Sequence, residues 1–156
     1  MELRTAILWI HALAGGAWVA AALCFVAAGM ALAAGSDDQR NFAMRAAPAI
    51  AAFGAAAAVV VLAAGVVNFF LAGAARGFRF SSEFGLILSI KSALFVGMSI
   101  ALGWTLRTAV SFRTAAEPCD RDTVAKAMAG MVRANGAIAV MGAIALLLGL
   151  WLMGSA

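Results

Sequence analysis

Four long apolar segments alternate with short polar stretches along this chain of 156 residues. The apolar segments cover residues 6–34, 47–72, 84–105 and 138–153. A helix needs roughly 20 residues to cross about 30 Å of hydrocarbon, and each segment with its flanks is long enough to do so. The pattern predicts an all-α fold, a four-helix transmembrane bundle with up-down topology that forms a single domain over residues 1–156.

The polar stretches carry signals that start and stop helices. Ser36, followed three residues later by Gln39, predicts a capping box at the start of the second helix. Pro48 removes a backbone hydrogen bond one turn earlier and predicts a kink near the membrane surface. Gly73 and Gly77 are expected to end this helix.

The two later helices have similar start signals. The third helix is expected to start after Ser81 or Ser82 and to run to about Arg107. Asp120 or Asp122 can cap the fourth helix, which enters the membrane further along the chain.

Composition supports a membrane protein. Hydrophobic residues make up 65% of the chain and charged residues 12%, whereas a soluble domain has roughly 45–50% and 25%. The lipid bilayer is therefore the expected partner. The formal charge of +4 could suggest nucleic-acid binding, but the basic residues sit in short segments between apolar runs, so we exclude that class.

The basic residues also predict an orientation. Those on one side of the membrane are Arg40, Arg45, Arg107, Arg113, Arg121, Lys126 and Arg133, and those on the other side are Arg4, Arg76 and Arg79. Because cytoplasmic loops carry an excess of Lys and Arg, the first side should be cytoplasmic. Both termini are then non-cytoplasmic.

The only histidine, His11, lies inside the first apolar segment. An ionisable residue within a membrane span is costly to bury and marks a functional site by default. Counted at 1.5 Å per residue from the same membrane face, His11 and Lys91 both lie roughly 10–12 Å deep, and Asn68 lies at a similar depth. We expect these three side chains to form one polar, cofactor-binding cluster, with His11 neutral and free to act as a ligand beside protonated Lys91.

Structural roles are the alternatives for each of these residues. His11 can donate to a carbonyl of another helix, Lys91 can snorkel to the nearby membrane face, and Asn68 can bond between helices. Met98 and Met141 lie near the middle of the membrane, where methionines usually pack. Their thioethers would also suit Cu(I), so His11 and Met98 are the candidate metal ligands.

Two motifs carry a resemblance to known families. The first is Trp9-Ile10-His11 followed by Gly15-Gly16-Ala17-Trp18, and the second is FGLILSIKSALF over residues 84–95. With these motifs the chain resembles the copper-resistance D (CopD) family of bacterial inner-membrane proteins and, more distantly, the HemJ family of protoporphyrinogen oxidases. The first resemblance implies copper movement across the inner membrane, and the second implies haem at His11.

Three functions therefore remain open. A copper-binding or copper-transporting protein comes first, a haem b-binding redox protein second, and a membrane scaffold without a cofactor third. The small residue Gly15, one turn from His11, leaves room for a flat porphyrin. A second haem ligand would come from Lys91, from a methionine, or from His11 of a second copy in a homo-oligomer, and without one the haem would remain five-coordinate. Enzymatic activity is left open, because the HemJ family has a further histidine and this chain has none.

Labelling of Cys119 tests the orientation. This cysteine lies in the polar stretch between the third and fourth helices, so it should react with a membrane-impermeant reagent only from the cytoplasmic side. Labelling that occurs only from the outside would contradict the predicted orientation.

Overall fold

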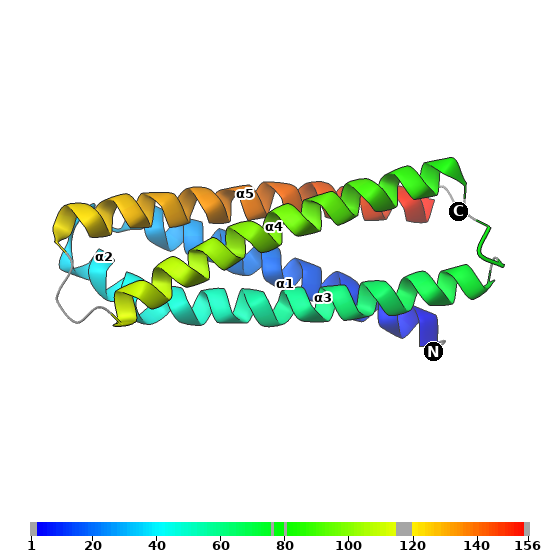
Figure 1. Ribbon diagram of the computed structural model, residues 1–156, viewed down its shortest axis with the longest axis horizontal. Coiled ribbons are helices and arrows are strands. Elements are labelled where there is room, and N and C mark those ends of the chain that lie inside the picture. The colour runs from blue at the N-terminus through cyan, green and yellow to red at the C-terminus, as the bar shows by residue number, and fades with distance from the viewer. Residues whose placement is uncertain (1–2, 76, 80, 115–119, 155–156) are drawn as a thin grey trace.

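The computed structural model describes residues 3–75, 77–79, 81–114 and 120–154. Four long helices lie side by side in it (Figure 1): α1 (Leu3–Ala31), α3 (Ala47–Ala75), α4 (Ser82–Thr114) and α5 (Arg121–Gly154). A short helix α2 (Asp37–Asn41) and a π-helical turn η1 (Phe42–Ala46) lead directly into α3. This arrangement confirms the predicted all-α four-helix bundle.

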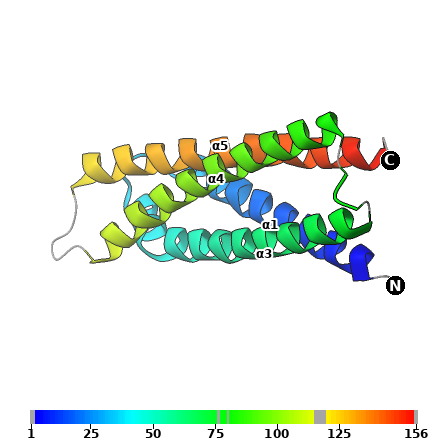
Figure 2. The ribbon, with the colours of Figure 1, turned by 45° about the vertical axis from the view of Figure 1, so that its right-hand side comes forward.

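The helices run up and down, so α1 begins and α5 ends at the same end of the bundle (Figures 1 and 2). Helix α1 packs against α3 and α5, and α4 packs against the same two helices. Within the described residues, four helical spans are long and apolar enough to cross a membrane. The chain therefore has the architecture of a small multi-pass membrane protein.

The start of the second span has the predicted cap. The hydroxyl of Ser36 accepts a hydrogen bond from the Gln39 amide at 3.1 Å. The side-chain carbonyl of Gln39 accepts one at 2.8 Å from the amide of Gly35, rather than from that of Ser36. The Ser36 amide already donates to the Ala33 carbonyl at 3.1 Å, so the Gln39 side chain bonds to the preceding amide, that of Gly35.

The turn before Pro48 departs from α-helical geometry. This is expected, because proline has no backbone N–H to donate. The amide of Ala47 bonds to the carbonyl of Phe42, five residues earlier, so this turn is π-helical. A proline ring also crowds the carbonyl four residues before it, here that of Met44. The wider π turn accommodates both effects without ending the helix.

The end of α3 uses both predicted glycines, in different ways. Gly77 has a φ of +58°, and its amide bonds to the Ala74 carbonyl at 3.4 Å. The Phe78 amide bonds to the Gly73 carbonyl at 2.8 Å, which completes a Schellman motif. The ring of Phe78 lies against Gly73, where a side chain would collide with it.

The bundle interior consists of small residues around a few large ones. One buried cluster comprises Trp18, Ala22, Ala51, Ala57, Ala58, Met98, Leu102, Ile138 and Ala139. A second comprises Phe25, Ala43, Ala47, Ala109, Val124, Met128 and Met131. Large apolar side chains such as Leu13, Val59, Ile100 and Leu150 are exposed on the outside. This distribution suits helices that associate through close backbone approach while their outer faces contact lipid.

Asp120 caps α5, which decides between the two candidate caps. One carboxylate oxygen of Asp120 accepts from the Thr123 amide at 2.8 Å, and the other accepts from the Thr123 hydroxyl at 2.6 Å. Helix α4 continues beyond Arg107 to Thr114, further than the apolar pattern indicated.

The replacement Gly142→Ala should destabilise the bundle. An added methyl group would collide with the Val19 side chain and come within 3.3 Å of the Met98 methyl, and such overpacking costs about 1–3 kcal/mol. The matched control is Gly136→Ala in the same helix, where nothing lies within 4 Å, so helix propensity should leave stability equal or slightly higher. Reversible unfolding in SDS, followed by far-UV circular dichroism, measures both. Val19→Ala should restore the loss, and equal effects of the two glycine replacements would contradict this packing.

The α5 cap should depend on pH. The hydroxyl and amide of Thr123 hold the pKa of Asp120 below its ordinary value of 3.8. The cap bonds therefore contribute fully above that value and weaken as pH falls through the lowered pKa. An NMR titration of the Asp120 carboxyl carbon should show this, and Thr123→Ala should move the pKa upward. Asp120→Asn, which still caps, should make the protection factor of the Thr123 amide, which is corrected for intrinsic exchange, independent of pH in this range. A midpoint at or above 3.8 in the unaltered protein would contradict the cap.

Candidate functional site

His11 lies on the face of α1 that contacts α3. Its Nδ1 atom is 3.0 Å from the carbonyl oxygen of Val61. Because a carbonyl can only accept, Nδ1 carries the ring proton, and Nε2 keeps a lone pair. His11 therefore donates to a carbonyl of another helix, which is the structural role considered in the sequence analysis. The same hydrogen bond fixes the tautomer in which Nε2 can bind a ligand.

Gly65 allows the imidazole to reach that carbonyl. It follows Val61 by one helical turn on the same face of α3. A methyl group added at Gly65 would come within 3.2 Å of the His11 Cε1 atom. The missing side chain therefore creates the space in which the ring lies.

Lys91 reaches from α4 toward α5. Its ammonium nitrogen would be 3.3 Å from a methyl group added at Gly149, so another glycine provides the space. The side chain is partly buried. His11 thus faces α3 and Lys91 faces α5, and each lies beside a glycine of the helix that it meets.

Asn68 lies on α3, seven residues beyond Val61 and on the same face. Its side-chain oxygen is buried and has no hydrogen-bond partner in the described part of the chain. Such a group costs about 1–3 kcal/mol unless something donates to it. No hydrogen bond joins Asn68 to His11 or Lys91 among the described residues, so the full three-residue cluster stays a prediction.

Met98 lies in a different layer from the polar residues. Its methyl group contacts Gly142, and the sulfur of Met141 lies against Gly97, so the two methionines pack reciprocally between α4 and α5. Met98 lies beside Gly142 of α5, and Lys91 lies beside Gly149 of the same helix. These two glycines are seven residues apart, so the two side chains differ in depth by roughly 10 Å. The described residues include no group of three or more His, Cys, Asp or Glu side chains suited to a metal. Joint metal binding by His11 and Met98 stays a prediction.

One buried polar pair was not predicted from the sequence. The amide of Asn135 in α5 donates to the Met131 carbonyl at 2.9 Å and to the Thr105 hydroxyl of α4 at 3.4 Å. That hydroxyl donates in turn to the Ala101 carbonyl at 3.0 Å. A signal was available, because Thr105 and Asn135 each lie two residues from an arginine and hence at one depth.

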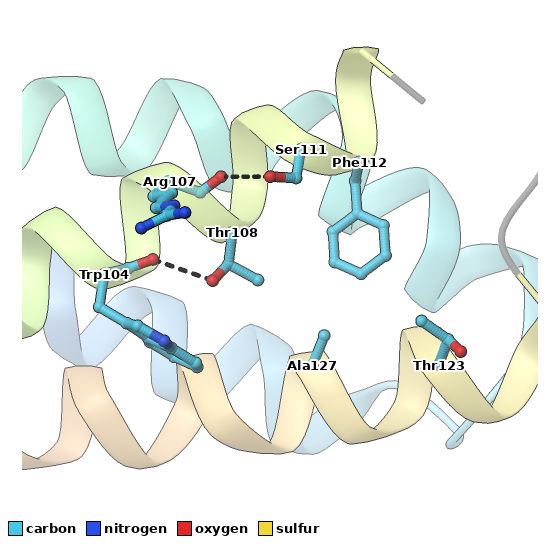
Figure 3. Close-up of a pocket in the computed structure, with 7 residues that line it drawn as sticks. All are labelled: Trp104, Arg107, Thr108, Ser111, Phe112, Thr123 and Ala127. Carbon is cyan, nitrogen blue, oxygen red and sulfur yellow. Dashed lines mark hydrogen bonds between the residues drawn. The ribbon is translucent and has the colours of Figure 1, made fainter. Parts of the chain in front are cut away.

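A hollow of about 370 Å³ opens between α4 and α5 (Figure 3). It lies near the end of α4 and the start of α5, whereas His11 lies near the start of α1, toward the other end of the bundle (Figure 1). Its lining residues are Trp104, Arg107, Thr108, Ser111, Phe112, Thr123 and Ala127. The Thr108 hydroxyl donates to the Trp104 carbonyl at 2.9 Å, and the Ser111 hydroxyl donates to the Arg107 carbonyl at 3.0 Å. Sequence reasoning did not find this hollow, because it lies between two helices.

Comparisons of the chain with protein-family models, with curated proteins and with solved structures found no match. The resemblance to the CopD and HemJ families therefore remains a prediction that rests on the two motifs in α1 and α4.

Proposed function

We propose that this small multi-pass membrane protein binds a metal centre through Nε2 of His11, and that haem b suits the site better than copper. The observation that carries the proposal is the bond from His11 Nδ1 to the Val61 carbonyl. Histidines that bind metals almost always donate their other ring N–H to a carbonyl or carboxylate, which orients the ring and makes it a better ligand.

The space expected beside Gly15 is taken by Leu146 and Val61, whose side chains lie 3.9 and 4.0 Å from a methyl group placed there, so a porphyrin would have to approach His11 from another side. Two other features favour haem over copper. A haem supplies four nitrogen ligands of its own and needs only one from the protein, in keeping with the single histidine of the chain. The Lys91 ammonium, which by the rise per residue lies at about the depth of His11, would offset the charge of a propionate carboxylate. When bound, the haem would supply one-electron redox chemistry. The chain's own part is to orient the imidazole, balance charge and exclude water with apolar helices.

Copper is the alternative. Cu(I) prefers two or three soft ligands. Met98 packs against Gly142, about two helical turns from the depth of Lys91 at Gly149, so it lies too deep to share a metal with His11 if His11 is at the depth of Lys91. The charge of Lys91 also opposes a second cation near His11. The CopD-like motifs support copper handling and a location in a bacterial inner membrane. The distribution of basic residues supports an orientation with both termini on the non-cytoplasmic side. In a homo-oligomer, His11 of a second copy would supply a second ligand if haem is bound.

The absorption spectrum of the purified protein after incubation with haem b tests the proposal. The unaltered protein should show a Soret band, and His11→Ala should reduce the bound haem at least tenfold without unfolding the bundle. Met98→Leu is the matched control, because it conserves volume and should leave the haem content unchanged. Added imidazole should restore binding to His11→Gly, which shows that the loss concerns the ligand rather than the fold.

Other outcomes would contradict the proposal in different ways. Equal haem content in the unaltered protein and in His11→Ala would reject His11 as the ligand. Copper detected by elemental analysis without a Soret band, and lost in both His11→Ala and Met98→Leu, would establish the copper alternative instead. A protein that binds neither would be the scaffold.

A further inference from the structure

The hollow between α4 and α5 exists because the two helices diverge. Figures 1 and 2 show α4 close to α5 where α4 begins, and crossing toward the start of α3 where it ends. The indole of Trp104 lies over Gly130 of α5, where any side chain would collide with it. Beyond this contact, Thr108 and Phe112 of α4 and Ala127 and Thr123 of α5 line opposite walls (Figure 3).

The hollow lies at the depth of the lipid headgroups. The apolar part of α4 ends at residue 105, and Arg107 and Ser111 of the lining follow it. Exposed tryptophan at such a boundary is typical of the membrane interface, and Trp104 is 45% exposed. This end of the bundle also carries most of the basic residues: Arg40, Arg45, Arg107, Arg113, Arg121, Lys126 and Arg133.

The polar groups of the lining suit a particular chemistry. The guanidinium of Arg107 is exposed and forms no ion pair with any residue described in the structure, so it can bind an anion. The hydroxyls of Thr108 and Ser111 already donate to carbonyls of their own helix. Their oxygens can therefore only accept, which calls for a donor on the ligand. The hydroxyl of Thr123 is likewise committed, since it donates to Asp120.

We propose that this hollow binds the headgroup of an anionic phospholipid whose headgroup also carries hydroxyls, such as phosphatidylglycerol. The phosphate would lie at Arg107, because a guanidinium matches its geometry and charge. The glycerol hydroxyls would donate to Thr108 and Ser111. Trp104 and Phe112 offer apolar surface to the start of the acyl chains. Basic pockets between transmembrane helices commonly bind such headgroups. The proposal is independent of the His11 site.

Native mass spectrometry of the delipidated, detergent-solubilised full chain tests this. The probes are phosphatidylglycerol and phosphatidylcholine with identical acyl chains. The unaltered protein should bind phosphatidylglycerol at least fivefold more tightly, since one basic contact with an anionic lipid contributes about that factor. Arg107→Gln should abolish the preference. Arg113→Gln is the matched control, because it removes the same charge from the same helix outside the lining and should keep the preference.

A variant that fills the hollow distinguishes the contribution of its shape to lipid binding from the contribution of its charge. Ala127→Leu keeps every charge but occupies the space, and it should weaken phosphatidylglycerol binding about as much as Arg107→Gln. Equal binding of the two lipids by the unaltered protein, or equal losses in Arg107→Gln and Arg113→Gln, would overturn the proposal. Displacement of the lipid by millimolar inorganic phosphate would also overturn it, because the ligand would then be a free phosphate.

Discussion

Close approach of helix backbones at glycine and alanine positions is the constraint on which this structure depends. Lipid offers no hydrophobic drive between transmembrane helices, so they associate by packing at short range. The indole of Trp18 illustrates the result. It lies 3.4 Å from the position of a methyl group at Gly54 and makes an edge-on contact with Phe95 at 5.7 Å between ring centres. One large ring thus fills the centre of a bundle built otherwise from small residues.

Small residues also make room for polar side chains between the helices. Gly65 leaves the space through which His11 reaches the Val61 carbonyl, and Gly149 leaves the space for the Lys91 ammonium. Packing and site are therefore not separate features here. A glycine in the wall of an apolar bundle brings a polar side chain close to a helix backbone, where carbonyl groups offer hydrogen bonds that the lipid cannot supply.

The two ends of the bundle use polar groups differently. Near the termini, His11 bonds to a carbonyl of α3, and the Lys91 ammonium lies against Gly149 of α5. Toward the other end, the buried amide of Asn135 in α5 donates to the Thr105 hydroxyl of α4. This pair links two helices directly through their side chains.

The sequence by itself determined the features that depend on near neighbours in the chain. The four spans follow from long apolar runs, and the helix ends at Ser36 and Gly77 involve residues within five positions of each other. The cap of α5 was narrowed to Asp120 or Asp122, and the structure selected Asp120. The depth of His11 and Lys91 could be counted from the rise per residue. Only the tertiary structure decided which groups meet: the Val61 carbonyl, Gly149, the Trp104–Gly130 contact and the hollow beside Arg107. The physical reason is that these helices are apolar on nearly every side, so hydrophobic periodicity does not reveal the face that each turns inward. The rotation and divergence of the helices are set instead by where small residues allow backbones to touch.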